Sequence, residues 1–423
     1  MDFLINCFAL IGSLGLFLFG MKTMSEGLEK FAGARLRNIL AAMTKNRVMG
    51  VLTGILITAL IQSSSATTVM VVSFVNAGLM TLAQSIGVIM GANIGTTVTA
   101  WIISAVGFKV NIAAFAIPLL ACGLPLIFSS KSNRKSLGEF IFGFSFLFMG
   151  LSYLQQAATD MNIGHYVAVM LSHIPCDSFF TIILFVIVGA LVTMIVQASA
   201  ATMAITLMLF DMNIPGFGFE QAAALAMGQN IGTTITAFMA SLTANTQARR
   251  AALAHMFFNV FGVIFVLLFF YPACDAVSWF VTDVMGTQAN DLFKLSAFHT
   301  AFNILNTLLL IGFVHQIEQF VCKVLPMKDN QEEEYRLMFI SSGMLSTAEL
   351  SILEAKKEIN SFAERCHRMF GIVVDLLHIE KDEEFNKQFS RVEKYENITD
   401  SMEVEIANYL HKVSEGRLSD DSK

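Results

Sequence analysis

The chain contains the stretch Gly54-Ile-Leu-Ile-Thr58-Ala-Leu-Ile-Gln62-Ser-Ser-Ser-Ala-Thr67, and a second version of it at Gly189-Ala-Leu-Val-Thr193-Met-Ile-Val-Gln197-Ala-Ser-Ala-Ala-Thr202. A second motif follows each copy. It reads Gly91-Ala-Asn-Ile-Gly-Thr-Thr-Val-Thr-Ala100 after the first and Gly228-Gln-Asn-Ile-Gly-Thr-Thr-Ile-Thr-Ala237 after the second, with eight of ten residues identical. Two motifs that recur in the same order indicate an internal repeat. Gly20 and Gly150, each after a Phe- and Leu-rich run, extend the match upstream.

The residues around these motifs have the composition of membrane sequence. Hydrophobic residues make up 55% of the chain and charged residues 14%, and no charged residue occurs from Val48 to Phe108. One helical crossing needs roughly 20 residues, so this stretch is long enough to enter and leave a bilayer. We predict an all-α polytopic membrane protein with spans near residues 3–21, 82–106, 111–129, 137–157, 219–243, 251–271 and 296–320. Residues 2–21 lack a positive leading segment and are expected to be a first span rather than a cleaved signal.

The segments near residues 50–78 and 180–210 are too long for one straight span. Four consecutive polar residues, Gln62 to Ser65, would point in nearly every direction from an unbroken helix, so some would meet lipid. A break at this point lets them face inward together. We therefore predict that each segment is a re-entrant hairpin of two half-helices.

The distribution of positive charge favours this topology. With both segments re-entrant and the N-terminus outside, the outside loops hold Lys109 and Lys294, and the inside loops hold eleven basic residues: Lys22, Lys30, Arg35, Arg37, Lys45, Arg47, Lys131, Arg134, Lys135, Arg249 and Arg250. An excess of Lys and Arg on the cytoplasmic side is the usual pattern. Two full spans instead would place Lys131, Arg134 and Lys135 outside.

Each repeat then crosses the membrane three times, so the second copy enters upside down relative to the first. This is the inverted-repeat plan of many secondary transporters. We predict a first transport repeat at 1–136, a second at 137–295, an additional transmembrane helix at 296–322 and a cytoplasmic helical tail at 323–423.

The helix breaks also supply ligands without any ionised side chain. Half-helix N-termini present unpaired N–H groups and a positive dipole end, which suit an anion. Carbonyl, hydroxyl and amide oxygens suit a small cation such as sodium. Glycine permits unwinding and Asn tolerates left-handed backbone, so we expect Gly91, Asn93 and Gly95, with Gly228, Asn230 and Gly232, to break a transmembrane helix in each repeat. The lack of Lys or Arg favours an oxyanion held by neutral donors, with co-bound cations balancing its charge.

The doubled motifs beginning at Gln62, Gly91, Gln197 and Gly228 resemble the sodium/phosphate cotransporter family, the type II sodium-dependent phosphate transporters and their bacterial relatives. The resemblance covers roughly residues 1–322. It implies a phosphate site at Gln62, Ser63, Ser64, Ser65, Gln197, Ala198 and Ser199. It implies sodium ligands at Gln62, Ser65, Thr67, Asn93, Thr96, Gln197, Ser199, Thr202, Asn230 and Thr233. The second copy departs from the pattern because Ala198 and Ala200 replace two serines, which leaves sodium number and substrate choice open.

The tail after Phe320 is charged and amphipathic, with Ser346 and Glu349 placed for a capping box. It is similar to the PhoU-like helical domains that follow many bacterial members, and we expect it to be an incomplete one. Glu396 and Asp400 fit the acidic i, i+4 pattern that binds metal in some of those domains, although we favour a solvated helix face.

Several of these residues also have a purely structural interpretation. Small residues in membrane helices usually serve close packing, an alternative that the duplication of the motifs disfavours. His255 with Asn259, and His299 with Asn303, are placed for a relay, but we favour satisfied interhelical hydrogen bonds. The six cysteines have no metal spacing. A Cys176–Cys274 disulfide in the outside loops is the less favoured alternative.

These observations predict a sodium-coupled symporter of inorganic phosphate with alternating access, in the plasma or inner membrane, with substrate between the two hairpin tips. Expected partners are inorganic phosphate, Na⁺ and the bilayer. No nucleic acid is expected, and no cofactor besides the coupling ions. A homodimer and a cytoplasmic regulator bound to the tail are further partners compatible with the resemblance. The alternatives are a phosphate exporter, a carrier of another oxyanion, or a phosphate-responsive membrane scaffold. No nucleophile, base and orienting group occur together, so no enzyme is expected.

Overall fold

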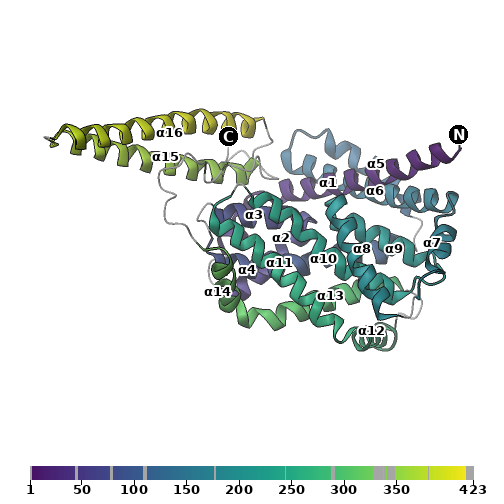
Figure 1. Cartoon of the computed structure of the whole chain (residues 1–423). Helices are drawn as coiled ribbons and strands as arrows, with labels where there is room; N and C mark the ends of the chain where they lie inside the picture. Colours follow the sequence, from purple (N-terminus) through teal and green to yellow (C-terminus); the bar gives the residue numbers. More distant parts are fainter. Residues whose placement is uncertain are drawn as a thin grey trace.

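The computed structural model describes residues 2–42, 46–76, 80–107, 112–175, 178–242, 244–286, 291–326, 337, 340, 348–379 and 381–415. These residues form helices joined by turns, and no strand occurs among them. Figure 1 shows a body of packed helices and, beside it, a long pair formed by α15 (Ala348–Leu376) and α16 (Asp382–Ser414). Lys45, Lys109, Cys176 and Ser346, on which predictions rest, lie outside the described residues.

Six helical segments of the described chain are long and apolar enough to cross a membrane. They are Leu4–Leu28, Leu82–Ala105, Ser132–Asp160, Phe179–Val196, Thr246–Leu267 and Leu292–Val324. The predicted all-helical polytopic membrane protein is therefore confirmed. The segment Phe179–Val196 belongs to a predicted hairpin but is long enough to cross alone, so the re-entrant course of that hairpin stays a prediction.

The first half of the body begins with α1 (Asp2–Ala42), which continues well beyond the predicted first span. The next segment divides at Gln62 into α2 (Arg47–Ile61) and α3 (Ser64–Asn76). It is followed by α4 (Leu82–Ile102) with a π-helical end, η1 (Ile103–Gly107), and by α5 (Ile112–Ile127). Asn46 caps α2 through its side-chain oxygen, which accepts a hydrogen bond from the Met49 amide.

The second half repeats this order. It contains α6 (Ser132–Asp160), a short α7 (Ile163–Leu171), α8 (Phe179–Val196), α9 (Ser199–Asp211), α10 (Phe219–Ser241) and α11 (Thr246–Leu267). The chain then forms α12 (Phe270–Trp279), the π-helix η2 (Phe280–Val284), α13 (Leu292–Leu310), the 3-10 turn η3 (Ile311–Phe313) and α14 (Val314–Val324). The division between α8 and α9 falls at Gln197, the residue equivalent to Gln62.

The prediction of a broken helix at the glycine motifs is wrong, because α4 and α10 run unbroken through Asn93 and Asn230. The glycines instead allow two backbones to touch. A Cβ on Gly91 would overlap the Val51 carbonyl oxygen on α2, and a Cβ on Gly228 would overlap that of Val186 on α8. The packing role of small residues is therefore the correct account of these glycines.

The same contacts give the direction of packing in each half. Gly91 and Gly95 of α4 lie against Val51 and Ile55 of α2, so both sequences advance together and the helices are parallel. In the second half, Gly228 and Gly232 of α10 lie against Val186 and Ala190 of α8 in the same sense.

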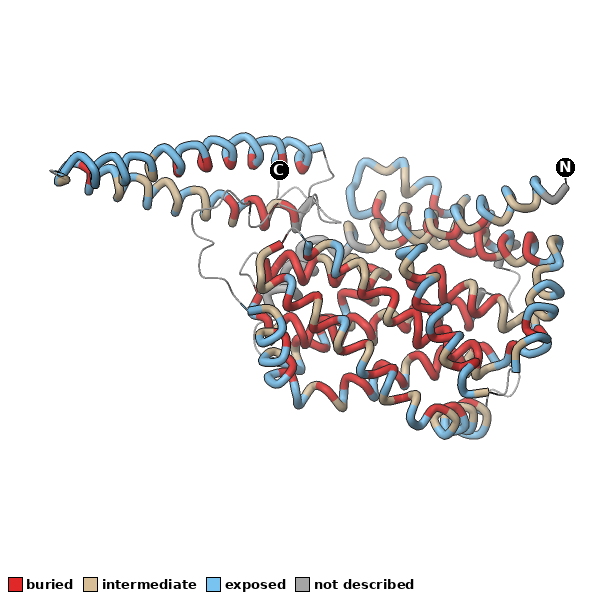
Figure 2. The backbone as a smooth tube through the Cα atoms, in the orientation of Figure 1, coloured by how far each residue is buried: buried red, intermediate tan, exposed pale blue. Residues whose placement is uncertain are grey.

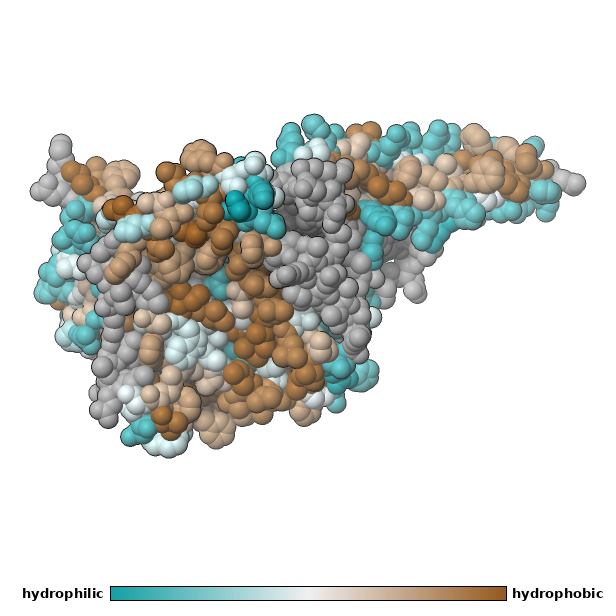
Figure 3. Space-filling view, turned by 180° about the vertical axis from the view of Figure 1, so that it is seen from behind, coloured by the Kyte–Doolittle hydropathy of each residue, from teal (hydrophilic) through white to brown (hydrophobic). Residues whose placement is uncertain are grey.

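Helices α1 and α6, one from each half, pack antiparallel through a second glycine seam. Gly20 of α1 lies against Gly143 and Leu147 of α6, whereas Gly150 of α6 lies against Phe17 of α1. The halves also exchange contacts deeper in the body, where α3 packs against α10 and α9 packs against α4. Figure 2 shows the buried residues concentrated in this body and a largely exposed surface along α15 and α16. From behind, apolar side chains cover much of the body and hydrophilic ones gather along the tail (Figure 3).

Candidate functional site

The first helix break is fixed by the backbone and side chain of Gln62. Its φ of 54° and ψ of 25° lie in the left-handed region, and its N–H still donates to the Thr58 carbonyl at 2.7 Å. The side chain is buried, with 7% of the residue exposed. Its Nε2 donates to the Ala59 carbonyl at 2.6 Å, and its Oε1 accepts a hydrogen bond from the Thr99 hydroxyl of α4 at 2.9 Å. The break is therefore tied to the second motif of the same half.

The hydroxyl residues after Gln62 begin α3. Ser63 Oγ accepts from the Ala66 amide at 3.2 Å, and Thr67 Oγ1 donates to the Ser63 carbonyl at 3.0 Å. Ser65 is half-buried. Ser64 is 4% exposed, and its Oγ has no hydrogen-bond partner among the described residues. A buried hydroxyl at the positive end of a helix is suited to an anionic ligand.

The second break repeats the backbone of the first. Gln197 has a φ of 54° and a ψ of 22°, and its N–H donates to the Thr193 carbonyl at 2.8 Å. A hydrogen bond of 3.1 Å joins the hydroxyls of Thr193 and Thr202, as one of 3.1 Å joins those of Thr58 and Thr67. Sequence reasoning did not single out Thr58, Thr99 or Thr193, although Thr58 and Thr193 recur at equivalent positions of the repeats.

The side chains at the second break differ from those at the first. Gln197 is exposed, and its Nε2 lies 3.9 Å from Met239 Sδ. Ala198 is half-buried and Ser199 is buried. The two predicted phosphate-binding clusters thus have the same backbone and different polarity.

The predicted supporting residues lie on α4 and α10. Asn93 Nδ2 donates to the Ile89 carbonyl at 3.1 Å, Thr96 Oγ1 donates to the Ala92 carbonyl at 3.0 Å, and Thr233 Oγ1 donates to the Gln229 carbonyl at 2.9 Å. Each threonine gives its hydroxyl proton to its own helix. Its oxygen lone pairs remain available to a cation.

Asn230 belongs to an interhelical network between α10 and α13. Its Nδ2 donates to Asn303 Oδ1 at 2.9 Å, and its Oδ1 lies 3.1 Å from His299 Nε2. The Asn303 Nδ2 in turn donates to the His299 carbonyl at 2.8 Å. The expectation of interhelical hydrogen bonds is therefore met at Asn303 Oδ1 and His299 Nε2, whereas His299 Nδ1 is buried without a partner among the described residues.

Satisfied interhelical hydrogen bonds were also expected for His255 and Asn259, and this prediction is wrong for one atom of each side chain. Asn259 Nδ2 donates to the His255 carbonyl of its own helix at 3.0 Å. Asn259 Oδ1 and His255 Nδ1 are buried without a hydrogen-bond partner among the described residues. The i, i+4 spacing therefore lets the Asn259 side chain hydrogen-bond to the backbone of its own helix, α11, rather than to a neighbouring helix.

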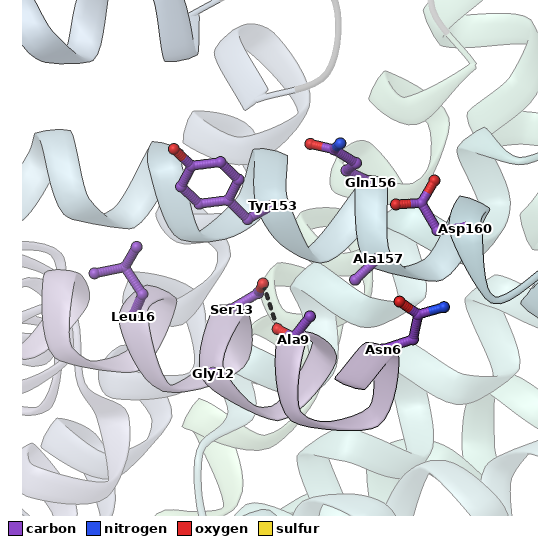
Figure 4. A pocket seen from close by; sticks show the side chains of 9 residues that line it. All are labelled: Asn6, Ala9, Gly12, Ser13, Leu16, Tyr153, Gln156, Ala157 and Asp160. Atoms are coloured by element: carbon purple, nitrogen blue, oxygen red, sulfur yellow. Dashed lines mark hydrogen bonds between the residues drawn. The ribbon is translucent and has the colours of Figure 1, made fainter. Parts of the chain in front are cut away.

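A pocket of about 350 Å³ lies elsewhere, between α1 and α6 (Figure 4). It is lined by Asn6, Ala9, Gly12, Ser13, Leu16, Tyr153, Gln156, Ala157 and Asp160, none of which is a predicted site residue. The described residues contain no group of three or more His, Cys, Asp or Glu that could hold a metal ion. Glu396 and Asp400 lie on the exposed face of α16. Cys274 is buried with a free thiol, and Cys176, the other cysteine of the less favoured disulfide, lies outside the described residues.

Six helices of spanning length among the described residues, and two halves that each contain a parallel helix pair and a helix break, define this chain as a multi-pass membrane protein. The chain belongs to the Na⁺/Pi-cotransporter family, whose model matches residues 16–156 and 162–280. That family consists of transporters rather than enzymes.

Three related proteins are similar to this chain over different parts of its length. The "Uncharacterized protein YqeW" of Bacillus subtilis is 32% identical over 74% of this chain and 96% of its own length. The "Putative inorganic phosphate export protein YjbB" of Salmonella typhimurium is 25% identical over 89% of this chain; the match spans 66% of that relative's length. The rat "Sodium-dependent phosphate transport protein 2A" is 38% identical over 97 residues, 22% of this chain and 15% of its own. No solved structure matches the chain significantly.

Proposed function

We propose that the protein is a secondary transporter that couples sodium to the movement of inorganic phosphate. The observation that carries this proposal is the pair of equivalent breaks at Gln62 and Gln197, with the same φ of 54° and neutral polar groups around both. Membership of the Na⁺/Pi-cotransporter family supports phosphate as substrate and sodium as coupling ion.

Phosphate is proposed to bind at Gln62, Ser63, Ser64, Ser65, Gln197, Ala198 and Ser199. Sodium is proposed to bind at oxygens of Gln62, Ser65, Thr67, Asn93, Thr96, Gln197, Ser199, Thr202, Asn230 and Thr233. The partnerless Ser64 hydroxyl supports the anion site because a buried polar group without a partner is costly. The absence of any charged residue from Val48 to Phe108 supports release of the anion, because no fixed cation holds it.

The repeats are proposed to occupy 1–136 and 137–295, followed by a helix at 296–322. The basic residues of the inside loops support an external N-terminus and a cytoplasmic tail. The tail is proposed to contact a cytoplasmic regulator. The protein is also proposed to form a homodimer.

Export of phosphate is the second candidate. The Salmonella relative, named a putative inorganic phosphate export protein and similar across 89% of this chain, supports this candidate. The two candidates share the binding site and differ in the direction of net flux.

Radiolabelled phosphate flux in proteoliposomes tests the proposal. An inward sodium gradient should drive uptake, an equal choline gradient should not, and Gln62→Ala should abolish the driven uptake while the protein stays monodisperse. Excess arsenate or sulfate reports the choice of oxyanion. Sodium-independent efflux would favour export without sodium coupling. Phosphate binding without flux, together with a cellular phenotype on deleting residues 330–423, would favour a scaffold.

A further inference from the structure

The two halves distribute their polar side chains differently. The first half has Ser63 and Ser65 next to its break, and the equivalent residues of the second half are Ala198 and Ala200. On the following helix the difference is reversed, because Ala92 of the first half corresponds to Gln229 of the second. The second half has therefore lost two hydroxyls at the break and gained an amide on α10.

The side-chain amide of Gln229 is buried and has no hydrogen-bond partner among the described residues. Its exposed fraction is 0%, and neither its Nε2 nor its Oε1 has a partner among the described residues. A buried amide in this state destabilises the folded protein relative to an amide that is hydrogen-bonded. Leu or Met would fill a similar volume without that cost. A bound ligand that satisfies the amide removes the penalty.

Neighbouring residues on α10 determine which ligand fits. Gln229, Thr233 and Thr236 have i, i+4, i+7 spacing and share one face of the helix. The hydroxyl of Thr233 donates to the Gln229 carbonyl at 2.9 Å, and that of Thr236 donates to the Thr233 carbonyl at 2.8 Å. Both hydroxyl protons are therefore used within the helix. Apart from the N–H donors of the single Gln229 amide, this face offers oxygen lone pairs from three side chains, which suit a small hard cation better than an anion.

We propose that the amide oxygen of Gln229 is an additional ligand of the coupling-cation site in the second half, with Thr233 and Thr236 on the same face. The inference rests on the proposed sodium coupling and adds residues that the family resemblance did not supply. It also fits the presence of Ala198 and Ala200 in place of two serines, since Gln229 supplies an additional oxygen ligand from α10.

The test measures thermal unfolding of the purified full chain in nanodiscs, in NaCl and in choline chloride at equal ionic strength. Wild type should be stabilised by sodium. Gln229→Leu should unfold at the same or a higher temperature in choline, because the partnerless amide is removed, and it should lose most of the sodium-dependent shift. Gln229→Met provides a second, unbranched variant in case the leucine disturbs folding.

Thr307→Val is the matched control. Thr307 is 3% exposed and its hydroxyl also has no partner among the described residues, but it lies on α13. This variant should keep the full sodium shift. In flux assays, the sodium concentration for half-maximal uptake should rise about tenfold or more in Gln229→Leu, the equivalent of 1.4 kcal/mol of lost binding.

An unchanged sodium shift in both Gln229 variants, with a normal shift in wild type, would overturn this inference and leave the proposed function standing. A wild type with neither a sodium shift nor sodium-driven uptake would overturn both.

Discussion

Gln62 and Gln197 adopt the same left-handed backbone, with φ of 54° at each, yet the side chain of Gln62 is buried and that of Gln197 is exposed. The Gln62 amide joins Ala59 to Thr99, whereas the Nε2 of Gln197 lies 3.9 Å from the sulfur of Met239. The backbone break is thus conserved between the halves of one chain, and the chemistry around it is not.

The first prediction separates the backbone role of Gln62 from its side-chain role. Glycine adopts positive φ without strain, so Gln62→Gly should preserve the break, whereas Gln62→Ala keeps a Cβ in an unfavourable region. Both variants should lose phosphate uptake, and the alanine variant should unfold at a lower temperature than the glycine variant. Uptake at the wild-type rate in Gln62→Gly would show that the amide is not a ligand.

The second prediction concerns the glycine contacts of α4 and α10. Gly91→Ala or Gly228→Ala places a methyl group on a backbone carbonyl, which cannot move aside as a side chain would. Each should lower stability by at least ~1–3 kcal/mol, seen as a fall in unfolding temperature. Gly15→Ala, where a Cβ meets nothing within 4 Å, is the control and should leave stability unchanged or raise it slightly, because Ala favours a helix more than Gly does.

The third prediction addresses the network of Asn230, His299 and Asn303. Removing the acceptor with Asn303→Ala leaves the buried Asn230 Nδ2 unpaired and should cost about 1–3 kcal/mol. In a double-mutant cycle, Asn230→Ala and Asn303→Ala should couple by about 0.5–3 kcal/mol of unfolding free energy. Additive effects would mean that the hydrogen bond between them contributes nothing to stability.

The fourth prediction concerns the pH dependence of the tail. Burial raises the pKa of Glu354 from 4.5 to about 8, and the nearby Glu358 adds to the rise, although the hydrogen bond from Tyr409 opposes it. Tyr409 donates to Glu354 Oε2 at 3.1 Å, which links α16 to α15. The folded pKa exceeds the unfolded one, so the stabilisation is complete below pH 4.5 and falls as the pH rises to about 8, where the folded carboxyl loses its proton.

Hydrogen exchange of α15 and α16 in the full chain, corrected for intrinsic rates, measures this effect. Protection should fall between pH 5 and 8 in wild type. Gln cannot ionise, so Glu354→Gln should show a much flatter profile. Equal pH dependence in the two proteins would mean that Glu354 does not control the stability of the helix pair.

The sequence predicted the helix breaks because Gln62 to Ser65 cannot all face inward from one intact helix. It did not predict the role of Gly91 and Gly228, because glycine is equally suited to an unwound backbone and to a close helix contact. Only the position of the neighbouring helix distinguishes these two roles. Thr99 was missed because its partner, Gln62, lies 37 residues earlier in the chain. Gln229 was missed because it differs between the repeats, and the comparison of repeats emphasised identity.

The antiparallel seam of α1 and α6 joins helices that begin the two halves, and its glycines bring the backbones together without long side chains. The surfaces by which the halves recognise each other are therefore encoded within each half rather than in the turn between Phe128 and Lys131. Fragments 1–130 and 131–423, made as separate polypeptides in one cell, should reassemble and co-purify, and Gly143→Leu in the second fragment should prevent it. The two halves should therefore associate as two separate subunits would, although one chain carries both.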